Sequence, residues 1–99
     1  MRLTQAQIKA IKSAAAEIFG DEADVWLFGS RADDTRRGGD VDLMVETDAL
    51  QDDPALLAAR LSARVSRSMY GRHVDVVVKA PGLAEQPIHR AALAQGIRL

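Results

Sequence analysis

The stretch LFGSRADDTRRGGDVDLMVE, residues 27–46, decides the fold of this chain. It joins the end of one apolar run to the start of another through a polar segment. Gly29 and Ser30 close the first run, and Asp40 and Asp42 stand at the beginning of the second. The apolar residues of this second run predict a buried strand, so the presence of two acids in it needs a physical explanation.

Both apolar runs have the pattern of β-strands. Residues 23–29, ADVWLFG, are apolar on both faces, which is typical of a central strand covered on both sides. Residues 40–46, DVDLMVE, alternate, so one face carries aliphatic side chains and the other carries Asp40, Asp42 and Met44. The two acids therefore interrupt only one face of this strand, and the other face is left for the core.

The rest of the chain predicts three helices and one more strand. A helix over 5–19 starts at the capping-box spacing of Thr4 and Gln7, and Gly20 ends it. The remaining segments are a helix over 54–70, a strand over 73–79 and a last helix over 84–95. The order helix, strand, loop, strand, helix, strand, helix predicts an α+β or α/β two-layer fold, with a small mixed sheet of three to four strands flanked by helices.

Composition limits the class of protein. The 99 residues, 47% hydrophobic and 27% charged, predict a single domain over 1–99. The net charge of -1 and the scattered basic residues argue against direct binding of nucleic acid, which needs a basic face. There is no cysteine, and no apolar stretch is long enough for a signal peptide or a membrane span. We therefore expect a cytoplasmic protein.

Asp40 and Asp42 have the spacing of a metal site. Side chains two residues apart on a strand leave the same face about 6.6 Å apart, so both carboxylates can approach one point. Two like charges so placed repel each other unless a cation neutralises them. Without cysteine, the hard oxygen ligands favour magnesium or manganese over zinc, and such a pair can hold the two ions used in phosphoryl transfer.

Asp75 and the Gly-Ser pair extend this hypothesis. Asp75 supplies a third acidic ligand if its strand lies beside 40–46 in the register that brings the acids together. Gly29 lets a phosphate approach the backbone, and Ser30 adds an N–H and a hydroxyl. The sequence thus predicts a metal pair beside a phosphate loop.

The segment LFGSRADDTRRGGDVDLMV resembles the signature of the DNA polymerase β-like nucleotidyltransferase superfamily, in which Gly-Ser is followed after a spacer by Asp-x-Asp. Nine residues separate Ser30 from Asp40 here. The GSRA opening and the short chain look most like the minimal nucleotidyltransferases (MNT), the antitoxins usually paired with HEPN-domain toxins. The resemblance covers almost the whole chain, since HVDVVV lies where the family carries its third acid.

The resemblance implies a role for each matching residue. Asp40 and Asp42 would hold both magnesium ions, and Asp75 would complete one metal site. Gly29, Ser30 and Arg31 would bind the triphosphate of a nucleotide. The spacer DDTRRGG differs from that of many relatives, so the resemblance gives no role to its two arginines, Arg36 and Arg37.

The function implied is magnesium-dependent transfer of NMP, most often AMP from ATP, to a hydroxyl group. By the same resemblance the acceptor is a tyrosine of a partner HEPN toxin, which the protein would silence as an antitoxin by AMPylation. Two alternatives stay open: an antitoxin that neutralises the toxin by binding alone, and nucleotidyl transfer to a small molecule. The sequence indicates neither which nucleobase is bound nor the oligomeric state. His73 is interpreted as a surface residue.

Overall fold

The computed structural model describes residues 3–29, 40–49 and 51–99, which form one mixed sheet and three helices. The elements are α1 (Gln5–Phe19), β1 (Asp24–Phe28), β2 (Val41–Glu46), α2 (Pro54–Ser68), β3 (Val74–Lys79), α3 (Pro87–Gln95) and β4 (Ile97–Arg98). The strand order is β3-β2-β1-β4, with β1 antiparallel to β2 and β4, and β2 parallel to β3. The predicted α+β fold with a small mixed sheet is confirmed.

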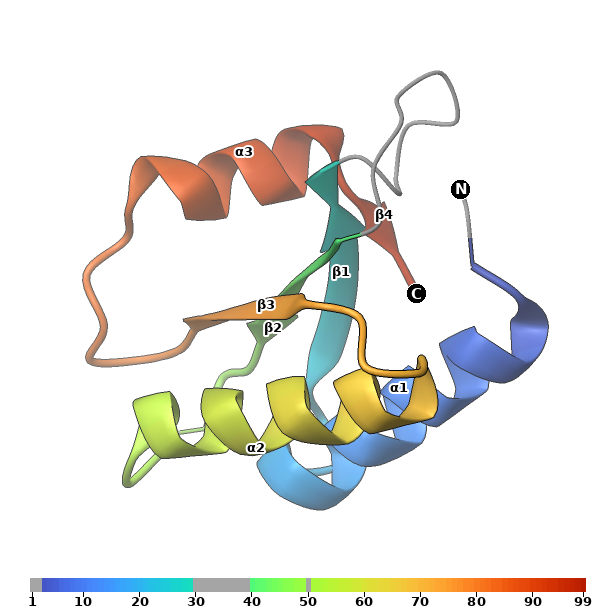
Figure 1. The fold of residues 1–99 in the computed structure, drawn as a ribbon. Coiled ribbons are helices and arrows are strands. Elements are labelled where there is room, and N and C mark those ends of the chain that lie inside the picture. The colour runs from blue at the N-terminus through green and yellow to red at the C-terminus, as the bar shows by residue number, and fades with distance from the viewer. Residues whose placement is uncertain (1–2, 30–39, 50) are drawn as a thin grey trace.

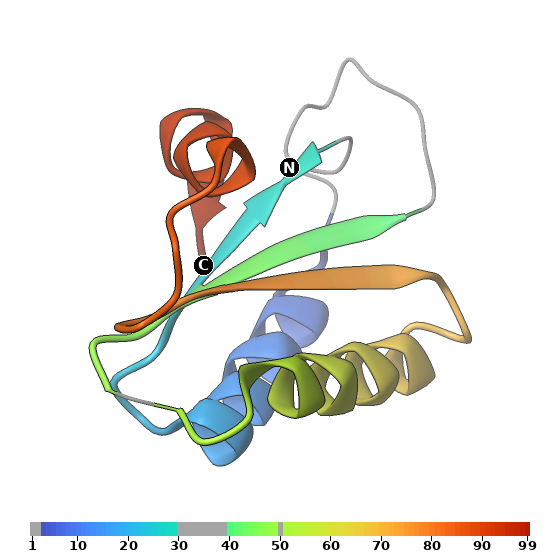
Figure 2. The same cartoon turned by 90° about the vertical axis from the view of Figure 1, so that its left-hand side faces the viewer.

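Helices lie on both faces of the sheet, so α3 adds a third layer to the predicted two-layer arrangement (Figures 1 and 2). Helices α1 and α2 cover one face and α3 lies over the other, as the two views in Figures 1 and 2 show. The aliphatic face of β2 packs into the core on the α1 and α2 side, where Val41, Leu43 and Val45 have no exposed surface. This is the face that the alternation of residues 40–46 assigns to the core.

Helix α1 has the predicted bounds because both of its ends are fixed locally. Thr4 Oγ1 accepts a hydrogen bond from the Gln7 backbone N–H at 3.1 Å, and Gln7 Oε1 accepts one from the Thr4 N–H at 2.9 Å. Gly20 ends the helix with a positive φ of 108°. None of the helices in the described ranges is long and apolar enough to cross a membrane.

The two other helices differ from the predicted bounds. Helix α3 begins at Pro87 and not at residue 84, because proline restricts the preceding Gln86 to extended backbone, with φ −113° and ψ 160°. Helix α2 ends at Ser68, before the predicted residue 70, since Tyr70 adopts a φ of +59°. A residue in the left-handed region cannot continue a right-handed helix.

The short strand β4 was not predicted as an element, since the predicted order ends with a helix. It pairs with β1 through Trp26 opposite Arg98 and Leu27 opposite Ile97. The Arg98 guanidinium also donates to Asp24 Oδ1 at 2.8 Å. A strand of two residues is too short to show alternation, so the sequence pattern does not indicate it. The strand forms because it pairs with β1.

Replacement of a fully buried β2 residue tests this packing. We expect Leu43→Ala to lower the free energy of unfolding by about 2–5 kcal/mol, because Leu43 has no exposed surface and its loss leaves a cavity. Leu56→Ala is the matched control, since Leu56 is 47% exposed, and its effect should stay within about 0.5 kcal/mol. Urea denaturation measures both, and equal losses would contradict the assigned core.

Candidate functional site

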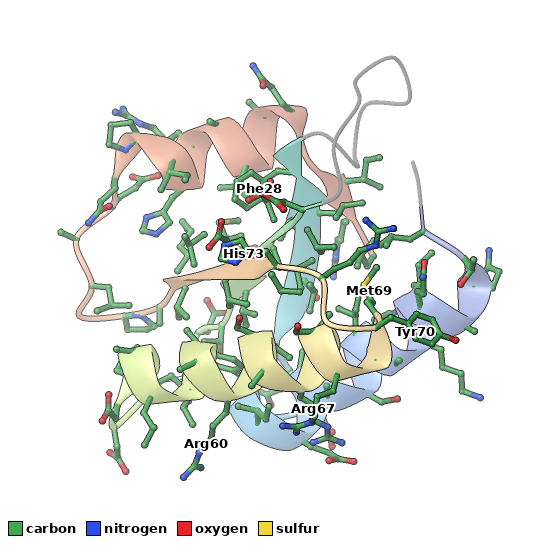
Figure 3. All side chains as sticks on the ribbon, in the orientation of Figure 1. Phe28, Arg60, Arg67, Met69, Tyr70 and His73 are labelled. Atoms are coloured by element: carbon green, nitrogen blue, oxygen red, sulfur yellow. The ribbon has the colours of Figure 1, made fainter. Side chains whose placement is uncertain are left out.

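The end of β1 and the beginnings of β2 and β3 meet at one edge of the sheet. Phe28 is the register partner of Asp42 in the antiparallel pair, and Asp42 is the register partner of Asp75 in the parallel pair. The strand register therefore meets the condition on which the predicted role of Asp75 depends. Figure 3 labels Phe28 and His73 at this edge of the sheet. We call this end of the sheet, formed by Gly29, Asp42 and Asp75, the acidic edge. It is the end at which strands start or finish, and not the open side of an outermost strand.

Gly29 and Asp42 are in close contact at the acidic edge. Gly29 has a φ of +72°, and a Cβ atom at this position would overlap Asp42 Oδ2. Glycine is therefore required twice here, for its backbone conformation and for the space that the carboxylate occupies. From the sequence, the absence of a side chain at Gly29 is expected to let a phosphate approach the backbone. In the structure, the Asp42 side chain lies beside the Gly29 backbone.

Asp75 has a neighbour that the sequence hypothesis did not assign to it. His73 Nε2 lies 2.9 Å from Asp75 Oδ1, and the two side chains are 64% and 59% exposed. The His73 carbonyl accepts a hydrogen bond from the Val41 N–H at 3.0 Å, which joins β3 to the start of β2. His73 is a surface residue, as predicted, and the His-x-Asp spacing on one strand face is the signal that could have indicated its contact with Asp75.

Asp40 lies directly before β2 and is exposed. Ser30, Arg31, Arg36 and Arg37 lie outside the described residues. Within the described ranges, no three His, Asp or Glu side chains are grouped closely enough to hold a metal ion.

The donor chemistry of the acidic edge nevertheless suits one class of metal. Its side chains offer carboxylate oxygens, and the neighbouring His73 adds one imidazole. The chain has no thiolate to offer because it lacks cysteine. Carboxylate oxygens are the ligands that magnesium and manganese prefer. The residues therefore fit a hard divalent cation.

Helix α3 lies over the face of the sheet that carries Asp42 (Figure 1). Met44, two residues after Asp42, has no exposed surface, and neither has Ala92 of α3. His89 of α3 is also buried, and its Nδ1 accepts a hydrogen bond from the Gln86 backbone N–H at 3.1 Å. His89 thus has a structural role at the start of α3, and the sequence assigns it no chemical one.

Comparison with known proteins extends these findings. The sequence model of the family described as nucleotidyltransferase domain matches residues 8–95. No curated protein sequence matches the chain. Among solved structures, the chain is similar to a chain in the complex of the tri-AMPylated HEPN toxin of Shewanella oneidensis with MNT antitoxin. The TM-score is 0.58 at 17% identity, over 91% of this chain and 69% of the other.

Substitution of Gly29 tests the contact with Asp42. Gly29→Ala and Gly71→Ala both place alanine at a positive φ, +72° and +82°, which costs about 1–2 kcal/mol of stability. Only Gly29→Ala also displaces the Asp42 carboxylate, because nothing lies within 4 Å of a Cβ at Gly71. We therefore expect the larger loss in urea denaturation for Gly29→Ala. Equal losses, with an unchanged NMR spectrum around Asp42, would show that the contact does not exist.

Proposed function

The chain belongs to the nucleotidyltransferase domain family, and from this premise we propose that it transfers AMP from ATP to a hydroxyl group of a partner protein. The match over residues 8–95 includes every residue of the acidic edge. The observation that carries the proposal is the register of Phe28, Asp42 and Asp75, which brings Gly29 and two acids to one end of the sheet. Such an arrangement can place a triphosphate beside hard cations.

We propose that Asp40, Asp42 and Asp75 hold two magnesium ions. Asp40 and Asp42 would contact both, and Asp75 would complete the ion nearer the acceptor. When bound, the ions would neutralise charge on the phosphates and activate the acceptor hydroxyl. The contact of His73 with Asp75 at 2.9 Å would hold that carboxylate in one orientation.

Gly29, Ser30 and Arg31 are the proposed triphosphate ligands. The Gly29 backbone lies at the end of β1, directly beside Asp42, so a phosphate bound there would be close to the proposed metal ligands. Catalysis by these residues would consist mainly of positioning and of charge stabilisation at the transferred phosphate.

The acceptor we propose is a tyrosine of a HEPN toxin, so that the protein would act as an antitoxin. The support is the fold similarity to a chain from a complex in which the HEPN toxin of Shewanella oneidensis is tri-AMPylated and bound to MNT antitoxin. We further propose that the chain is a single domain and acts in the cytoplasm, where ATP and magnesium are available. Its acceptor would then come from a separate chain.

Transfer of AMP can be measured by intact-mass spectrometry. The purified chain is incubated with ATP, magnesium and a HEPN protein encoded beside it, and we expect the HEPN protein to gain the mass of one or more AMP groups. Asp42→Asn should slow this transfer by about a hundredfold or more, because it removes a charge that the reaction needs. Asp48→Asn is the matched control, since Asp48 is exposed just beyond the opposite end of β2, and it should retain the wild-type rate.

Two results would count against the proposal. If folded protein transfers no nucleotide to the HEPN protein with any of the four common nucleoside triphosphates, the enzymatic account is wrong. If an Asp40→Asn, Asp42→Asn double variant still neutralises the toxin fully, neutralisation occurs by binding alone. A mass increase on a small molecule, with none on the HEPN protein, would replace the proposed acceptor.

A further inference from the structure

Strand β3 lies at an open edge of the sheet. Its partner is β2, and it is the outermost strand on that side, as Figure 2 shows. Its sequence, VDVVVK, has three consecutive valines, Val76 to Val78, with charges only near its ends. Natural edge strands usually carry charges, proline or bulges that prevent pairing with another strand. The middle of β3 has none of these features.

The backbone of β3 presents alternate residues to this open edge. The His73 and Lys79 carbonyls accept hydrogen bonds from β2 and the residue after it, so odd-numbered residues face β2. The backbone groups of Val74 point away from β2, since its carbonyl accepts a hydrogen bond from the hydroxyl of Ser62 in α2. By the alternation of a strand, the N–H and C=O groups of Val76 and Val78 are therefore directed away from the sheet.

An apolar groove of about 330 Å³ follows the same edge. Leu83 and Ile88, which are 42% and 41% exposed, lie along it together with the three valines of β3. Pro54, Ala55 and Ala58 of α2 complete the apolar part of its lining. The unpaired edge and the apolar groove form one continuous surface, which we call the β3 surface.

We propose that the β3 surface binds a second copy of this chain, through antiparallel pairing of the two β3 strands about a two-fold axis at Val77. In this register Val76 of each copy lies opposite Val78 of the other. Both residues direct their backbone groups outward, so the two pairs can exchange four N–H···O=C hydrogen bonds. The Val77 residues face each other at the axis, in a pair without hydrogen bonds.

The charges of β3 favour a second copy over an unrelated strand. The segment DVVVK, residues 75–79, has its acid and its base at equal distances from Val77. The two-fold axis therefore places Asp75 of each copy opposite Lys79 of the other, on the same face of the extended sheet. Lys79 Nζ lies 3.3 Å from Glu46 Oε2 within its own chain, so it would be shared between two carboxylates.

This inference rests on the β3 surface and does not depend on the proposed transfer of AMP. If both hold, pairing places the lysine of one copy beside Asp75 at the acidic edge of the other.

Two charge variants test the register. In a homodimer, Asp75→Lys would put two lysines opposite each other, and Lys79→Glu would do the same with two acids. Each variant alone should lose the dimer, whereas an equal mixture should restore it, because the charges are complementary in the mixed pair. Sedimentation equilibrium should give twice the monomer mass of 10.7 kDa for the wild type and for the mixture only.

Tyr70→Ser is the matched control for the loss of association. Tyr70 is fully exposed and does not line the groove, so its replacement should leave the dimer mass unchanged. Thermal unfolding followed by circular dichroism establishes that each variant is folded before its mass is interpreted.

Amide hydrogen exchange followed by NMR gives a second readout that needs no variant. The Val76 and Val78 amides should become protected as the protein concentration rises, whereas the Val77 amide, which faces β2, should be protected throughout. A wild type that stays monomeric at its highest soluble concentration would overturn the proposal. So would a dimer that both charge variants retain, or protection of Val76 and Val78 that appears only when a different protein is added.

Discussion

The candidate site depends on one contact, between the Asp42 carboxylate and the backbone of Gly29. A side chain at residue 29 would occupy the space of Asp42 Oδ2, and the positive φ at this residue also favours glycine. The contact joins the end of β1 to the start of β2, where Phe28 and Asp42 are register partners. Strand β3 pairs with β2 in parallel and in the register that makes Asp75 the partner of Asp42, so Asp75 comes to the same edge.

Strand β2 combines stability and chemistry because its two faces differ. Leu43 and its aliphatic neighbours are buried against α1 and α2, whereas Asp42 lies on the opposite face, on the side of α3 (Figure 1). The buried face makes the register costly to change, since a shift by one residue would place the acids in the core. The core therefore fixes the position of Asp42 relative to its neighbours.

Much of this arrangement could be predicted from the sequence, because it follows from local patterns. The apolar run of residues 23–29 and the alternation in the two later strands located the three longer strands to within one residue of their observed ends, and the Thr4 and Gln7 capping box located α1. What could not be predicted depends on contacts between distant segments. The short β4 exists through its pairing with β1, and the neighbour of Gly29 is a carboxylate from the next strand. The start of α3 also follows from a local pattern, because proline is favoured in the first turn of a helix and Pro87 stands there.

We propose that Gly29, Asp42 and Asp75 form one site for a divalent cation with a nucleotide. Paramagnetic broadening by Mn²⁺, added with a non-hydrolysable ATP analogue, measures this directly in the amide NMR spectrum. We expect the signals of these three residues to broaden together at the lowest Mn²⁺ concentration, while that of Thr47, just beyond the opposite end of β2, stays sharp. Broadening centred on Thr47 and its acidic neighbours, or none at the acidic edge, would contradict it.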